Sequence, residues 1–125
     1  MPVKEIIAII RPKKMGATRD ALDKLGFPGL TAVLVLGRGK QHGIAGEVNV
    51  DLRPGVLAMG GLNGMKYVPK RLLAMVVRDS DVDAVAQTII DVNQTGEIGD
   101  GRIFICPIES VTRIRTDEEG EKAIL

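Results

Sequence analysis

The chain has 125 residues and 13.4 kDa, which predicts one domain (residues 1–125) with a single hydrophobic core. A formal net charge of +1 and only 2% aromatic residues exclude the usual features of a nucleic-acid-binding protein. One cysteine, Cys106, excludes an internal disulfide and a cysteine-cluster metal site. No apolar run approaches the ~20 residues of a membrane span, and residues 1–5 lack a signal-peptide pattern, so a cytoplasmic protein without membrane insertion is expected.

The first half of the chain predicts a strand, a helix and a second strand. Residues 4–11 form a short isoleucine-rich run, typical of a buried strand that stops at Pro12. From residue 16 the apolar positions recur with a helical period, and Gly26 stands where a helix C-terminal glycine is expected. Residues 30–36 (LTAVLVL) predict the second strand.

The second half repeats this order. Residues 70–78 predict a strand, and Ser80 with Asp83 resembles a capping box that opens a helix. Residues 102–107 and 110–115 complete the extended segments. The resulting β-α-β, loop, β-α-β order predicts an α+β, ferredoxin-like subunit, an antiparallel sheet with both helices on one face. The other face of the sheet would be exposed in a single subunit, and self-association is expected to bury it.

A long glycine-rich segment separates the two halves. Eight of the 15 glycines fall between residues 37 and 64, and residues 39–67 are too many for a simple connector. The segment also carries valines, leucines and methionines, which would gain from burial against a partner. It therefore predicts a docking loop that changes conformation.

Two basic motifs in the last third of the chain are typical of anion binding. Thr95 to Arg102 (TGEIGDGR) holds three glycines, whose backbone N–H groups can converge on an anion beside Arg102. Arg113 and Arg115 alternate along an extended segment, so both side chains are expected on one side, where they suit polyphosphate oxygens. A salt-bridged strand end near residues 117–119 is the alternative.

No catalytic constellation is evident. The stretch 37–43 (GRGKQHG) misses the dinucleotide-binding fingerprint, and no GxxxxGK[ST] motif exists. His42 has no Ser, Cys or Asp partner at diagnostic spacing, and Cys106 lies in an apolar strand where it packs as a small hydrophobe. The sequence predicts a protein that is not an enzyme.

Five motifs together resemble the PII signal-transduction family. They are AIIRP (8–12), GLT (29–31), GRGKQHG (37–43), VPK (68–70) and TGEIGDGRIFI (95–105). The resemblance implies a trimer of ferredoxin-like subunits that binds ATP or ADP between subunits and 2-oxoglutarate together with Mg-ATP. It also implies a T-loop, here residues 39–68, that docks on target proteins.

The resemblance also implies which residues bind these ligands. Phosphates would be held by Gly99, Gly101 and Arg102, with Arg113 and Arg115 reaching across the subunit boundary. The adenine would be lined by Gly29, Thr31 and Val76. Further cofactor-binding positions at the base of the loop would be Gly37, Lys40 and the backbone amides of 39–43. Gln41 would bind Mg²⁺, and Lys70 would pair with a carboxylate of 2-oxoglutarate.

Departures from the common family pattern resemble the nitrogenase-associated branch. The loop is longer than usual, and its single tyrosine, Tyr67, stands against the closing strand, so uridylylation by the usual route is not expected. Residues 116–118 read Thr-Asp-Glu where Thr-Gly-Glu is usual. In that branch two different PII-like subunits assemble together and inhibit dinitrogenase, and 2-oxoglutarate relieves the inhibition.

Two other functions stay open at this point. The chain could be a general PII sensor acting on an ammonium channel or on the regulation of glutamine synthetase. It could also be a small acylphosphatase-like hydrolase, with arginine near a glycine turn cradling a phosphate, although no side chain is spaced to supply a nucleophile.

Overall fold

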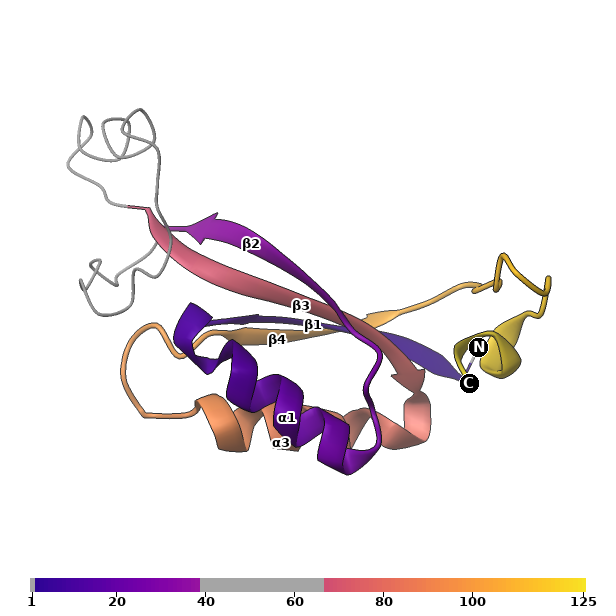
Figure 1. Cartoon of the computed structure of the whole chain (residues 1–125), viewed down its shortest axis with the longest axis horizontal. Helices are drawn as coiled ribbons and strands as arrows, with labels where there is room; N and C mark the ends of the chain where they lie inside the picture. The colour runs from indigo at the N-terminus through magenta and orange to yellow at the C-terminus, as the bar shows by residue number, and fades with distance from the viewer. Residues whose placement is uncertain (1, 39–66) are drawn as a thin grey trace.

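The computed structural model describes residues 2–38 and 67–125, and Figure 1 shows their arrangement. Four strands and two α-helices follow one another as β1 (Val3–Ile10), α1 (Met15–Leu25), β2 (Thr31–Gly37), β3 (Val68–Arg78), α3 (Val82–Asn93) and β4 (Arg102–Pro107). Short 3-10 helices stand at η1 (Pro12–Lys14), η3 (Asp79–Asp81) and η4 (Gly120–Ile124). Of the predicted T-loop (39–68), residues 39–66 lie outside the described residues, and Val68 is already the first residue of β3.

The strands form one antiparallel sheet in the order β2-β3-β1-β4, and both helices cover the same face of it (Figure 1). The two central strands, β3 and β1, are the two most buried ones, because each is flanked by strands on both sides. The predicted α+β, ferredoxin-like order of elements is confirmed. The predicted ends of the strands differ from the observed ones by at most two residues.

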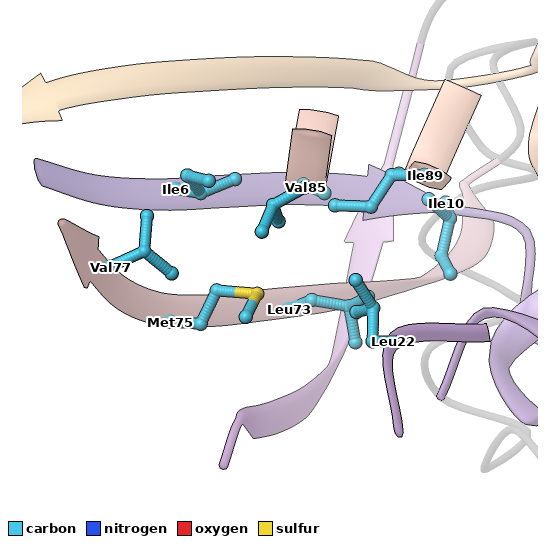
Figure 2. Close-up of a cluster of buried hydrophobic side chains, with 9 residues drawn as sticks. Ile6, Ile10, Leu22, Leu73, Met75, Val77, Val85 and Ile89 are labelled. Carbon is cyan, nitrogen blue, oxygen red and sulfur yellow. The ribbon is translucent and has the colours of Figure 1, made fainter. Parts of the chain in front are cut away.

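The core lies between the sheet and the helices (Figure 2). Alternate residues of β1 and β3 point into it, since side chains of a strand alternate between the two faces of a sheet. The helices contribute Leu22 from α1 together with Val85 and Ile89 from α3, each at most 2% exposed. The core set is aliphatic throughout, comprising Ile6, Ala8, Ile10, Leu22, Leu73, Met75, Val77, Val85 and Ile89.

The opposite face of the sheet is also apolar, and none of the helices that the structure describes covers it (Figure 1). On this face Phe104 of β4 stands opposite Ile7 of β1, and Val33 of β2 stands opposite Leu72 of β3. Phe104 is 45% exposed and Val33 is 49% exposed. Apolar side chains in this number on one face gain free energy when another surface covers them.

Helix ends were predicted with mixed success. Gly26 does end α1: its φ of 103° is left-handed, and its N–H donates to the carbonyl oxygens of Asp23 and Leu22. The capping box of Ser80 and Asp83 is wrong. Ser80 lies inside η3, and α3 begins at Val82 with Asp81 as its N-cap residue and no side-chain cap bond. The extra 3-10 turn shifts the first α-helical turn, so the Ser80 hydroxyl is not at the N-cap.

The predicted extended segment 110–115 is also wrong. Thr112 makes an isolated bridge with Glu119, and the chain then turns, with the Arg113 carbonyl accepting from the N–H groups of Thr116 and Asp117. Asp117 adopts a left-handed φ of 61° in this turn. Because the backbone turns at this point, Arg113 and Arg115 do not lie side by side on one face of a strand.

Candidate functional site

The connection between α3 and β4, residues 94–101, is shaped by glycines at left-handed positions. Gly96, Gly99 and Gly101 have φ values of 86°, 100° and 114°. Gly101 also lies directly against β1, since a Cβ atom placed on it would stand 1.9 Å from the Ile9 carbonyl oxygen. A side chain at position 101 would force the connection away from the sheet.

Asp100 fixes the connection from within. Its carboxylate accepts hydrogen bonds from the backbone N–H groups of Thr95, at 2.7 Å, and Gly96, at 2.9 Å, and from the Thr95 hydroxyl. The Thr95 hydroxyl in turn accepts from the Glu97 N–H at 3.1 Å. The carboxylate therefore closes the loop back onto its own start.

Arg11 ties this loop to the sheet. It follows β1, is 5% exposed, and its Nη1 lies 2.7 Å from Asp100 Oδ1 while its Nη2 donates to the Ile98 carbonyl oxygen at 3.0 Å. Sequence reasoning missed Arg11 as a site residue. The available signal was the charged residue at the end of the apolar run in AIIRP, because a buried arginine requires a partner.

These contacts change how Asp100 takes up a proton. The Thr95 hydroxyl, the backbone N–H groups of Thr95 and Gly96, and Arg11 together hold the pKa of Asp100 well below its ordinary value, although burial opposes them. The folded state thus binds this proton less readily than the unfolded state, whose aspartate pKa is about 3.9. Asp100 stabilises the fold above that pH, and its contribution is lost as the pH falls below it.

We therefore expect Asp100→Asn to be less stable than the parent at neutral pH, and the difference to shrink as the pH falls from about 5 to about 2. Urea unfolding at a fixed protein concentration measures it. The control is Asp23→Asn, on the exposed side of α1 and remote from this connection, which should keep the parent's stability at neutral pH. A difference between Asp100→Asn and the parent that is constant with pH would contradict this role for the Asp100 carboxylate.

Lys70 approaches the same connection from β3. It is buried, and its Nζ donates to the Gly99 carbonyl oxygen at 2.8 Å. Beside it lies a cavity of ≈ 600 Å³ whose walls include three cationic side chains, Arg38, Lys70 and Arg102. The remaining lining residues come from four places in the chain and are Ile9, Gly37, Val68, Ile98, Gly99, Gly101 and Phe104.

This cavity unites five of the residues that the sequence singled out: Gly37, Lys70, Gly99, Gly101 and Arg102. Its size is that of an ordinary small-molecule site, and its charge suits an anion. The turn of glycines can present backbone N–H groups, and the cations can neutralise a polyphosphate or a carboxylate.

Five other predicted residues lie away from the cavity. Gly29 and Thr31 stand just before and at the start of β2, and Val76 lies six positions along β3 from Lys70, which is about 20 Å in a strand. Arg113 and Arg115 belong to the C-terminal segment, at the opposite end of the sheet from residues 94–101 (Figure 1). Lys40 and Gln41 fall outside the described residues.

Two negative findings hold for the described residues, 2–38 and 67–125. Neither α1 nor α3 has the length and apolar character that crossing a membrane requires. Within the same residues, His, Cys, Asp and Glu side chains do not gather in groups of three or more that could hold a metal ion.

Residues 3–118 match the family model described as "Nitrogen regulatory protein P-II". The chain belongs to the P-II family. Among its relatives, "Nitrogen fixation nifHD1 region GlnB-like protein 2" of Methanosarcina barkeri is 57% identical, over 98% of this chain and 99% of the relative. "Nitrogen fixation nifHD region glnB-like protein 2" of Methanococcus maripaludis is 48% identical, over 98% of this chain and 100% of the relative.

The fold agrees with a solved P-II structure. A crystal structure of Arabidopsis thaliana PII bound to citrate matches with a TM-score of 0.73 and 34% identity, over 98% of this chain and 92% of that one. P-II proteins are regulatory proteins that form trimers, interact with target proteins and bind small effectors. The resemblance to the P-II family, drawn from the five motifs, and to its nitrogenase-associated branch, drawn from the departures, is confirmed.

Proposed function

We propose that this P-II protein binds ATP or ADP, Mg²⁺ and 2-oxoglutarate, and that it acts in the cytoplasm as a regulator without catalytic activity of its own. One observation carries the proposal: Gly37, Lys70, Gly99, Gly101 and Arg102 line one cationic cavity of ≈ 600 Å³. These residues come from separate parts of the sequence, and the family motifs contain all of them.

The nucleotide phosphates would lie along residues 99–102. The glycines there let backbone N–H groups approach an anion closely, and Arg102 adds a fixed positive charge. The Arg11–Asp100 pair holds this connection in place before a ligand arrives, which lowers the cost of ordering it on binding.

The 2-oxoglutarate dianion would lie beside Lys70 and the backbone amides of 39–43, with Gly37 and Lys40 at the same end of the cavity. Lys70 is well suited, because its buried ammonium stands on the wall shared with Gly99 and has three donors. We assign Gln41 as a protein ligand of Mg²⁺. The bound ion would supply an oxygen-seeking positive charge between nucleotide and 2-oxoglutarate.

A second subunit would complete each site. Gly29, Thr31, Val76, Arg113 and Arg115 lie far from the cavity within one chain, so they would serve the cavity of a neighbouring chain. The apolar sheet face that includes Val33 and Phe104 supports the trimer that P-II proteins form. We propose that the whole chain, 1–125, is one such subunit, assembled with copies of itself or with a paralogous PII-like subunit.

The proposed target is dinitrogenase, inhibited when 2-oxoglutarate is low. The names of the relatives, which refer to nitrogen-fixation gene regions, favour this target over an ammonium channel or glutamine synthetase regulation. Residues 39–68 would dock on the target, and 2-oxoglutarate would relieve inhibition by binding the free regulator more tightly than the docked one.

A calorimetric titration and a pull-down test this function. We expect 2-oxoglutarate to bind only in the presence of Mg-ATP, and the chain to retain dinitrogenase from solution until both are added. A chain lacking residues 44–64 is the control and should retain none. Tight 2-oxoglutarate binding without nucleotide would contradict the proposed site, and recovery of an ammonium channel in place of dinitrogenase would contradict the proposed target.

A further inference from the structure

The guanidinium of Arg113 is enclosed by the end of its own chain. Its Nη1 lies 3.2 Å from Glu118 Oε1, and its Nη2 donates to the Lys122 carbonyl oxygen at 3.0 Å and also to the backbone oxygen of Leu125. All three acceptors belong to residues 118–125, named here the C-terminal clamp. Arg113 is thus bound within its own subunit, although the proposed function assigns it to a nucleotide.

The clamp is anchored by backbone hydrogen bonds. The Arg113 N–H donates to the Glu118 carbonyl oxygen at 2.8 Å, and the Gly120 N–H donates to that of Val111 at 3.1 Å. The Thr116 hydroxyl donates to Glu118 Oε1 at 2.8 Å, on the same oxygen that faces Arg113. The Glu118 carboxylate is therefore held in a defined position against the guanidinium.

The geometry leaves Arg113 without a complete fork for a phosphate. A guanidinium grips an oxyanion with two parallel N–H groups, one from Nη2 and one from either Nη1 or Nε. Both hydrogens of Nη2 are already directed at Lys122 and Leu125. A two-bond contact with a phosphate therefore requires that at least one clamp contact break.

We propose that Glu118, through the C-terminal clamp, competes with nucleotide phosphates for Arg113 and so lowers the affinity of the protein for ATP. The proposal rests on the nucleotide function proposed above. Glu118 weakens nucleotide binding in two ways. Its carboxylate forms an ion pair with the Arg113 guanidinium, and its negative charge repels phosphate oxygens that approach Arg113. Glu118 is a positioning residue, acting through Arg113.

The direction of the effect separates competition from simple structural support. If Glu118 only supported the turn at 113–119, removing its charge would loosen Arg113 and weaken ATP binding. If it competes, removing its charge weakens one of the three clamp contacts on Arg113 and removes the repulsion of phosphate oxygens, so ATP binding is strengthened.

The test is calorimetric titration of the full chain with ATP, without 2-oxoglutarate. We expect Glu118→Gln to bind ATP about three- to fivefold more tightly than the parent, the range of a partly exposed ion pair. The control is Glu121→Gln, which removes the same charge from the clamp. Glu121 is exposed and makes no hydrogen bond or ion pair with any residue in the described part of the chain. The Glu121→Gln variant should therefore bind ATP with the parent's affinity.

Glu118→Ala, which removes both carboxylate oxygens, provides the second variant and should bind ATP at least as tightly as Glu118→Gln. Unchanged or weaker ATP binding by both variants, with the parent binding ATP normally, would overturn the competition and leave the proposed function standing. Equal tightening by Glu121→Gln would also overturn it, since general charge would then be the cause. A folded parent that binds neither ATP nor ADP would overturn both proposals.

Discussion

Replacing Gly101 with alanine is expected to destabilise the fold by more than about 3 kcal/mol and to abolish nucleotide binding. The new Cβ would stand 1.9 Å from the Ile9 carbonyl oxygen and 3.0 Å from the carbon of the same group. These atoms belong to the central strand β1, which pairs with β3 and β4 on its two sides and cannot move aside. The left-handed φ of 114° adds strain for any residue with a side chain.

Gly26→Ala separates the cost of the left-handed φ from the cost of the contact between a side chain and β1. Gly26 has a similar φ of 103°, but nothing lies within 4 Å of the Cβ it would gain. We expect it to cost about 1 kcal/mol, the ordinary penalty of the left-handed conformation, and to leave nucleotide binding unchanged. Urea unfolding at one fixed protein concentration measures both variants. Equal destabilisation by the two substitutions would show that the contact between residue 101 and β1 does not contribute to the loss of stability in Gly101→Ala.

The periodicity of apolar residues was enough to predict the framework. The isoleucine run of β1 and the run of β3 are buried on both sides by neighbouring strands, which makes them easy to recognise. Gly26 marked the end of α1 because a left-handed C-cap strongly favours glycine. These signals are local, so they can be read from neighbouring residues alone.

The two wrong predictions, the capping box and the extended segment 110–115, concern places where the backbone could form either of two local hydrogen-bonding patterns. Ser80 and Asp83 have the spacing of a capping box, yet the 3-10 turn at Asp79–Asp81 takes its place before α3. Residues 110–115 alternate like a strand, but the Arg113 carbonyl finds closer partners in the N–H groups of Thr116 and Asp117. Periodicity alone cannot decide between two such hydrogen-bonding patterns.

The motifs predicted much of the candidate site, and long-range contacts supplied the rest. Gly99, Gly101 and Arg102 were recognisable because glycine turns beside a cation are typical of anion sites. The pair of Arg11 and Asp100 was not, since the two residues are 89 positions apart and neither is unusual alone. The capture of Arg113 by Glu118 depends on where the turn directs each side chain, which composition does not reveal.

Lys70 offers the sharpest test of where 2-oxoglutarate binds. We expect Lys70→Met to weaken 2-oxoglutarate binding in the presence of Mg-ATP by at least about 30-fold, because a dianion would lose its buried cationic partner. Methionine keeps an unbranched apolar stem of similar length, so the start of β3 stays packed. Binding of ATP alone should change by less than about threefold, since Arg102 and the backbone of 99–102 would still hold the phosphates.

Lys4→Met is the matched control. Lys4 lies on β1 opposite Val77, near the end of β3 that is far from Lys70, and pairs with Asp79 at 3.3 Å on the surface. The Lys4→Met substitution removes the same charge from the protein as Lys70→Met, so any general electrostatic effect on a dianion would appear in both variants. Calorimetry with 2-oxoglutarate at saturating Mg-ATP compares them. If Lys70→Met kept the parent's affinity, or if both variants weakened 2-oxoglutarate equally, the carboxylate would have to bind elsewhere, and the cavity between β3 and residues 99–102 would serve the nucleotide alone.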